Sequence, residues 1–149
     1  MMTLIYLDGL NGINYHRLMT PFLRLKAEEG LEIHFFEDFN ELKDWDLSKV
    51  KNLVVSRRCS VSNHKEFKKY LVDNDIKLIL DNDDYWNLPK HNPAHDYYKN
   101  VEGPNIKATI AIADEIWSPS KYLIKIMRKI NSKPIYRLIP NTIYENEKQ

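Results

Sequence analysis

Three aspartates near the middle of the chain, Asp81, Asp83 and Asp84, have the type and spacing that acid–base chemistry uses. They follow residues 76–80, an apolar cluster of strand length that only Lys77 interrupts. Ligands of open α/β sheets bind beyond the carboxyl ends of the strands, and crowded carboxylates raise one another's pKa. We therefore predict that Asp83 and Asp84 are catalytic, as the general base toward an acceptor hydroxyl or as its anchor. Capping of backbone amides at the strand end is the alternative.

Aromatic and histidine side chains follow these aspartates. Tyr85 and Trp86 are candidates for stacking on a sugar ring or a lipid acceptor, because such side chains combine an apolar face with a polar edge. Packing of the loop onto the domain is the alternative role of Trp86. His91 and His95 are four residues apart, but Pro93 between them argues against a regular helix. We predict no zinc site here, and we retain His91 as a residue that lines the binding cleft.

Two other loops carry candidate ligand-binding groups. In the loop at residues 8–14, Gly9 and Gly12 allow backbone amides to approach a ligand, and the start of the following helix favours an anion. Their order does not match G-x-G-x-x-G, so the loop does not predict dinucleotide binding, and a tight turn is the alternative. Arg57 follows a third strand, where its guanidinium can bind a phosphate or carboxylate through two hydrogen bonds. The alternative for Arg57 is a surface salt bridge, which contributes little stability.

An alternation of strands and helices must position these groups. The hydrophobic pattern predicts strands at residues 4–7, 31–36, 53–55, 76–80, 115–118 and 134–139, and helices at residues 15–29, 63–72, 106–113 and 120–131. Residues 87–104 are expected to be rich in loops. Because strands separated by helices form βαβ units, we predict an α/β fold: a single Rossmann-like domain with helices flanking a mainly parallel sheet. Asn14 is expected to cap the first helix and Pro21 to kink it.

The predicted domain spans residues 1–143, and residues 144–149 are interpreted as a polar tail or the start of an interdomain linker. Of the 149 residues, 43% are hydrophobic and 29% are charged, and the net charge is +1. This charge gives no global attraction to nucleic acid, so no nucleic-acid partner is predicted. No apolar stretch is long enough for a membrane span and the N-terminus lacks a signal-peptide pattern. A cytoplasmic location is therefore predicted.

Two further features allow a functional and a structural interpretation. Cys59, the single cysteine, cannot form an internal disulfide, and it follows two arginines that can lower its pKa. No other feature marks it as a nucleophile. The helix at residues 120–131 carries a basic face, formed by Lys121, Lys125, Arg128 and Lys129. Such a helix can contact an anionic membrane surface, but a solvent-facing role is favoured, because cations near a helix C-terminus complement its dipole.

Five separated segments together resemble the N-terminal half of a GT-B glycosyltransferase, of the nucleotide-sugar-dependent group often labelled family 4 or family 1. They are Gly12-Ile13-Asn14-Tyr15-His16-Arg17-Leu18 with Pro21, Val54-Val55-Ser56-Arg57, residues 78–86 with Leu88-Pro89, Ala113-Asp114-Glu115-Ile116-Trp117-Ser118-Pro119-Ser120 with Tyr122-Leu123, and Ile139-Pro140-Asn141. The resemblance covers nearly the whole chain. It implies that the domain binds a sugar or glycan acceptor and is part of a hexosyltransferase.

The resemblance also implies roles for individual residues and for a partner. The implied substrate-binding residues are Gly9, Asn11, Gly12, Asn14, Tyr15, Arg17, Arg57, Trp86 and His91. In such enzymes a second domain holds most of the nucleotide-sugar donor, so we expect a donor half from a separate subunit or a homo-oligomer. Asp81-Asn82-Asp83 also spells the D-x-D of metal-dependent GT-A enzymes. Because the surrounding segments fit GT-B better, we predict neither a metal ion nor a cofactor.

Two other classes of function stay open. The domain can be a stand-alone, non-catalytic module that binds a glycan, a nucleotide or a protein. An interface near residues 139–143 would favour the enzyme with a donor partner, and a polar or self-paired face would favour the module. A phosphoacceptor receiver domain is also α/β with clustered aspartates. It ranks low, because its acid pair follows the first strand, where this chain has only Asp8.

Overall fold

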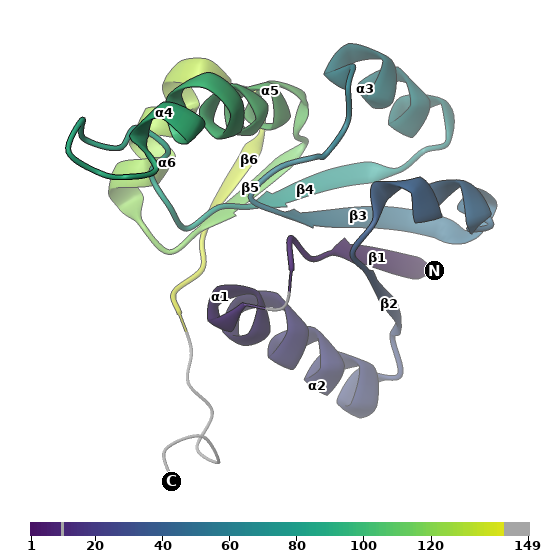
Figure 1. Ribbon diagram of the computed structural model, residues 1–149. Coiled ribbons are helices and arrows are strands. Elements are labelled where there is room, and N and C mark those ends of the chain that lie inside the picture. The colour runs from purple at the N-terminus through teal and green to yellow at the C-terminus, as the bar shows by residue number, and fades with distance from the viewer. Residues whose placement is uncertain (10, 142–149) are drawn as a thin grey trace, which may run out of the picture.

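The computed structural model describes residues 1–9 and 11–141, which form a six-stranded sheet whose neighbouring strands are all parallel (Figure 1). The strands are β1 (Met2–Tyr6), β2 (Glu32–Phe36), β3 (Val50–Ser56), β4 (Lys77–Asp81), β5 (Glu115–Ser118) and β6 (Ile135–Leu138). Their order across the sheet is β2-β1-β3-β4-β5-β6. This arrangement is α/β and Rossmann-like, which confirms the predicted fold class. The predicted tail at residues 144–149 lies outside the described residues.

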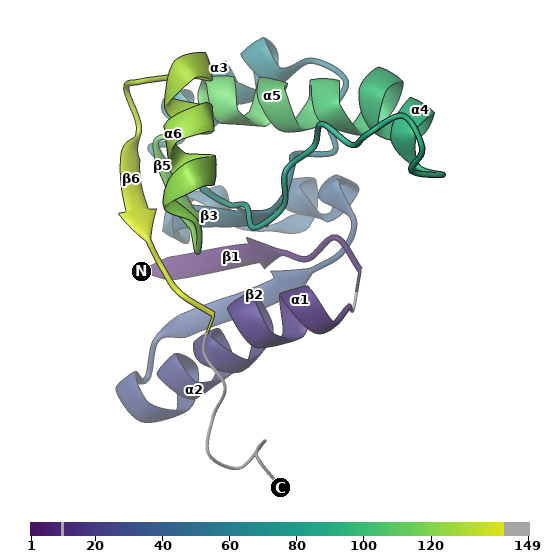
Figure 2. The ribbon, with the colours of Figure 1, turned by 90° about the vertical axis from the view of Figure 1, so that its left-hand side faces the viewer.

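Helices cover the two faces of the sheet unequally (Figures 1 and 2). The helices α3 (His64–Asp73), α5 (Gly103–Ile112) and α6 (Lys121–Ile130) lie on one face, and α1 (Gly12–Asn14) and α2 (Thr20–Glu29) lie on the other. Short 3-10 turns at Phe39–Asp44 and Leu47–Lys49 connect β2 to β3, and α4 (His95–Tyr97) precedes α5. Within the described residues, none of the helices has both the length and the hydrophobicity that crossing a bilayer requires.

The chain leaves β1 and β3, two neighbouring strands, toward opposite faces of the sheet. The helix α2 follows β1 on one face, and α3 follows β3 on the other (Figure 1). Such a reversal is the topological switch point of an open α/β sheet, and the diverging loops form a crevice beyond the strand ends. The loop after β1 and the residues after β3 and β4 therefore share this edge of the sheet.

The first helix begins earlier than predicted. It starts at Gly12, and Asn11 caps it by accepting a hydrogen bond from the Asn14 backbone amide at 2.9 Å. The prediction that Asn14 caps the helix was therefore wrong. A π-helical segment, Tyr15–Met19, links α1 to α2 and ends just before Pro21. Because proline has no amide hydrogen, this wider turn lets the helix continue through Pro21.

The prediction of a loop at residues 87–104 was only partly right. The helix α4 starts at His95 and continues through a second π-helical segment, Tyr98–Glu102, into α5. Pro104 lies at the start of α5, where a missing amide hydrogen is tolerated. Gly103 is required at this junction, because a Cβ atom there would lie 2.6 Å from the Tyr98 carbonyl oxygen. The expectation of a loop therefore holds for residues 87–94 and is wrong for residues 95–104, which are helical.

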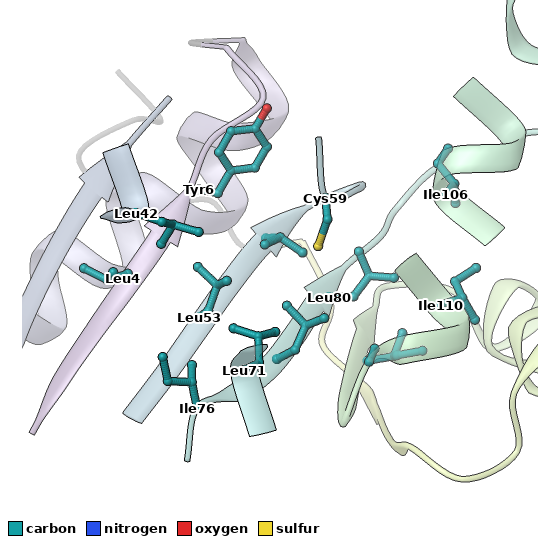
Figure 3. Packing of buried hydrophobic residues seen from close by; sticks show 14 of the residues in the cluster. Leu4, Tyr6, Leu42, Leu53, Cys59, Leu71, Ile76, Leu80, Ile106 and Ile110 are labelled. Atoms are coloured by element: carbon teal, nitrogen blue, oxygen red, sulfur yellow. The ribbon is translucent and has the colours of Figure 1, made fainter. Parts of the chain in front are cut away.

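Apolar clusters on the two faces of the sheet form the core. The larger cluster packs side chains such as Leu4, Leu53 and Leu80 against α3, α5 and α6 (Figure 3). The smaller cluster contains Ile5 and Val54 and lies under α1 and α2. Successive strand residues point to opposite faces, so the central strands β1, β3 and β4 contribute to both clusters. Burial on both faces explains why the central strands are nearly continuous apolar runs.

Candidate functional site

The residue after β3 has an unusual backbone conformation at the edge of the crevice. Arg57 has a φ of +64°, and the Arg58 amide donates to the Ser56 carbonyl at 2.7 Å, which closes a γ-turn around it. The Arg57 amide is held by the Asp81 carbonyl at 2.8 Å. A γ-turn with positive φ is rare and strained for a residue with a side chain. Strain of this kind persists only where the surrounding structure enforces it, and it is found most often at active sites and ligand-binding sites.

This turn directs the Arg57 side chain toward the acidic loop after β4. Its guanidinium lies 3.4 Å from the Asp84 carboxylate and 3.5 Å from the Tyr98 hydroxyl. Both contacts are long, and half of the Asp84 side chain is exposed. Arg57 and Asp84, which the sequence predicted as site residues, are thus brought together, with groups that remain open to a ligand.

Asp83 occupies a different environment from Asp84, although the two are adjacent. The Asp83 side chain is partly buried, whereas Asp84 is exposed. Burial raises the pKa of Asp83, and the negative charges of Asp84 and Asp81 raise it further. The positive charge of Arg17 acts in the opposite direction. Burial and like charge thus both act on the Asp83 carboxylate, and its role as a general base stays a prediction.

The Arg17 side chain is buried at this edge of the sheet, where its guanidinium forms hydrogen bonds with other residues of the protein. Its guanidinium forms a two-pronged contact with the buried Asp81, with Nε to Oδ2 at 2.8 Å and Nη2 to Oδ1 at 2.5 Å. Its Nη1 donates to the Ile139 carbonyl at 3.2 Å and to Asn141 Oδ1 at 2.7 Å. Only 4% of the Arg17 side chain is exposed. It therefore ties the end of β4 to the chain that leaves β6, and positions the aspartates that follow.

The loop after β1 is fixed from within by Asn14. Its side-chain amide donates to the Gly9 carbonyl at 2.7 Å, and its side-chain oxygen accepts a hydrogen bond from the Ser56 hydroxyl. Gly9 has a φ of +79°, a conformation that side chains disfavour. Asn14 is buried and acts in positioning the loop. In contrast, Asn11, Gly12 and Tyr15 are exposed.

The aromatic and histidine candidates lie in different settings. Trp86 is only 5% exposed and packs in the larger core cluster, so the packing role describes it better than stacking on a ligand. The adjacent Tyr85 is exposed and contacts Trp86 edge to face. His91 is exposed on the loop after β4, and within residues 1–9 and 11–141 no hydrogen bond or ion pair joins it to the aspartates. The Nδ1 atom of His95 lies 2.7 Å from the Leu88 carbonyl oxygen, with which it forms a hydrogen bond.

A buried ion pair that the sequence did not predict supports the strained turn. The Arg58 Nε lies 2.9 and 2.8 Å from the two carboxylate oxygens of Glu102. Arg58 also contacts Ser60 at 2.5 Å and Asp8 at 3.5 Å. These residues come from three separate segments, around Asp8, Arg58 and Glu102, so no local pattern could reveal them. Tyr98, which faces Arg57, was missed for the same reason.

The environment of Cys59 differs from the one that the sequence predicted. It is fully buried, and its sulfur is directed into the apolar core (Figure 3). Burial raises its pKa to about 12, and this outweighs the opposing effects of Thr109 and Arg58. The expectation that adjacent cations lower this pKa was wrong, because desolvation of the thiolate dominates.

Among the described residues, no group of three or more His, Cys, Asp or Glu side chains is placed to hold a metal ion. In the D-x-D segment, the Asp81 carboxylate is engaged by Arg17. Comparison of the sequence with known protein-family models and with curated proteins gives no match. The resemblance to GT-B glycosyltransferases therefore stays a prediction from the motifs.

Proposed function

We propose that this domain binds the hydroxyl acceptor of a nucleotide-sugar-dependent glycosyl transfer, and that a separate domain or chain binds the donor. In this mechanism the Asp83 carboxylate takes the proton of the acceptor hydroxyl. The hydroxyl oxygen forms a bond to the anomeric carbon of the sugar, and the nucleoside diphosphate leaves with the electrons of the broken bond. Asp84 and Arg57 lie beside this position and hold polar groups of the acceptor.

The observation that carries the proposal is the partly buried Asp83 at the crevice edge, with its pKa raised by burial and by two neighbouring carboxylates. A general base is most effective when its pKa approaches the working pH. The strained turn at Arg57 supports the same location, since it brings a cation to within 3.4 Å of Asp84. Neutral sugar hydroxyls suit such a mixed site, because they both donate and accept hydrogen bonds.

A second observation supports a partner domain on the side where the chain leaves β6. A hollow of about 310 Å³ lies beside Ile139 and Pro140. Its other lining residues are His16, Arg17, Pro21, Phe22, Leu25, Asp81 and Trp117. Apolar side chains form most of this lining, as expected of a surface that another domain covers. Residues 142 and 143, which the sequence included in the predicted interface, lie outside the described residues.

Ligand-induced thermal stabilisation tests the proposal. The purified chain is heated with simple glycans and glycosides, and separately with UDP-, GDP- and ADP-sugars. We expect a glycan to stabilise the chain against heat. In Asp83→Asn we expect the affinity for the same glycan to be about tenfold lower. Asp44→Asn, a change at an exposed aspartate far from β4 in sequence, is the matched control and should bind normally. Stabilisation by a nucleotide sugar that Asp83→Asn abolishes would instead place the donor at this site and overturn the division of roles.

The alternative, a non-catalytic binding module, has one observation in its favour. Arg17, Asn14 and Trp86 are engaged by the protein itself, which leaves fewer side chains for a substrate. Glycan binding that is unchanged in Asp83→Asn would favour this module, because the Asp83 carboxylate would then make no contact with the acceptor that contributes to binding. Binding of neither ligand class would favour a protein-binding module.

A further inference from the structure

The strand β6 is an edge strand with one side unpaired. Toward β5, the Ile135 amide donates to the Asp114 carbonyl at 3.1 Å, and the Ile139 amide donates to the Ser118 carbonyl at 2.9 Å. In a parallel pair, alternate residues direct their backbone groups to the same neighbour. The backbone N–H and C=O groups of Tyr136 and Leu138 therefore face the open edge. They are available to pair with another extended segment.

A groove runs between this edge strand and α6, which lie side by side (Figure 2). It has a volume of about 580 Å³ and is lined by Lys121, Ile124, Lys125, Arg128, Lys129, Tyr136 and Leu138. Four of these side chains are cations and none is an acid. Arg128 lies over the Tyr136 ring, 5.1 Å from its centroid. The groove thus combines a positively charged wall with an apolar floor.

Apolar side chains on both faces of β6 are exposed. Leu138, on the groove side, is 46% exposed, and Ile135, on the opposite face, is 52% exposed. An added strand would cover both, because its side chains alternate between the two faces in step with those of β6. Pro134 and Pro140 flank β6, and proline cannot donate to a strand ladder. The edge therefore fits a short segment better than a long one.

We propose that β6 and α6 form a docking groove for a short, extended acidic segment of a partner protein, which adds to the sheet beside β6. Acidic side chains on the α6 side contact Lys121, Lys125 and Lys129, and apolar side chains on the opposite face cover Ile135. Backbone hydrogen bonds to Tyr136 and Leu138 supply affinity, and the alternating pockets and charges supply specificity. This function is independent of the glycosyl-transfer proposal and uses a different surface.

The geometry of the groove favours a peptide over other anions. Single-stranded nucleic acid requires free aromatic faces for base stacking, but the Tyr136 ring is covered by Arg128, and its hydroxyl donates to the Asn131 carbonyl at 2.5 Å. A lipid surface has no backbone groups to pair with the open edge of β6. A peptide strand alone uses the cations, the apolar floor and the unpaired edge together.

The test uses a fluorescent octapeptide of alternating Glu and Val, with blocked ends, and follows its binding by fluorescence anisotropy. Two further peptides carry N-methyl groups on all Glu amides or on all Val amides. In an added strand only one of these two sets faces β6, so we expect one methylated peptide to lose binding and the other to keep it. A peptide of the same composition with four Glu followed by four Val should bind about tenfold more weakly.

Matched variants separate the role of charge from that of the edge. Lys121→Glu/Lys125→Glu should weaken binding about tenfold or more, whereas Lys65→Glu/Lys69→Glu on α3 should leave it unchanged. Leu138→Pro removes an amide from the open edge, and Leu138→Ala removes only the side chain. Because this amide does not pair with β5, both variants should fold, and the proline variant should bind more weakly. Circular dichroism checks the fold of each variant.

Several results would overturn the proposal. One is equal binding of both N-methylated peptides, which would show that no backbone ladder forms. Another is tighter binding of an oligothymidylate or of anionic phospholipid vesicles, with the same loss in Lys121→Glu/Lys125→Glu, which would assign the groove to nucleic acid or to a membrane surface. Absence of peptide binding at 1 mM (a concentration at which about 4 kcal/mol of binding energy suffices) would also refute it.

Discussion

The buried pair of Arg17 and Asp81 should dominate the stability of the carboxyl edge of the sheet. Both side chains are only 4% exposed, and the guanidinium contacts both carboxylate oxygens. Removal of one partner of such a pair costs about 3–5 kcal/mol, because the other charge stays buried without compensation. Arg17→Met also removes the hydrogen bonds to Ile139 and Asn141. We therefore expect a loss of about 4 kcal/mol in the free energy of unfolding.

Urea denaturation followed by tryptophan fluorescence measures this loss. For a chain of about this size, about 4 kcal/mol corresponds to a decrease of about 8–16 °C in Tm. Lys69→Met, which breaks an ion pair with Asp73 whose side chains are 77% and 55% exposed, is the control and should cost about 0.5 kcal/mol or less. The double variant Arg17→Met/Asp81→Leu should recover most of the loss, because it leaves no buried charge. The reasoning fails if Arg17→Met costs no more than Lys69→Met.

Three other changes have defined outcomes. Gly103→Ala should destabilise the protein by about 1–3 kcal/mol in urea denaturation, since its Cβ would lie 2.6 Å from the Tyr98 carbonyl oxygen, whereas Gly12→Ala, with nothing within 4 Å, should not. Asp83→Asn should raise the Tm at pH 7 and lose this advantage below pH 3.8: a folded-state pKa above the ordinary 3.8 means that stability falls as rising pH ionises the group. Cys59 should resist iodoacetamide in the native protein at pH 8 and react in urea, because its pKa is about 12 and it is buried.

The sequence predicted the sheet well because the central strands β1, β3 and β4 are buried on both faces. Continuous apolar runs such as Leu78-Ile79-Leu80 leave a strong local signal, and each of the six predicted strands is present. Helix boundaries were less accurate where the deciding contact is specific. The start at Gly12 depends on the capping by Asn11, and the helix from His95 depends on a π-helical segment beside Pro104. Neither feature follows from hydrophobic periodicity.

The candidate site was predictable in position but not in the use of its residues. The rule that ligands bind beyond strand ends placed Asp83, Asp84 and Arg57 at one edge, and the structure brings them there. The same rule could not distinguish residues that face solvent from residues that hold the site together. Arg17 became a positioning residue because a partner 64 positions away, Asp81, lies directly opposite it. Contacts at such separations leave no mark in a single sequence.

Two residues at the carboxyl edge of the sheet lower the stability of the fold, and this supports a functional interpretation of the edge over a purely structural one. A strand end can be closed with neutral, unstrained residues, yet this chain places Arg57 in a γ-turn with positive φ and Asp83 where ionisation is unfavourable. Both features lower stability, the first by backbone strain and the second by desolvation and like charge. The ion pair of Arg57 returns little stability, since its contact with Asp84 is 3.4 Å long and Asp84 is half exposed. Selection for stability alone would remove both, so we infer that a ligand maintains them. Asp83→Asn separates the two interpretations, because a purely structural edge predicts a gain in stability with no loss of binding.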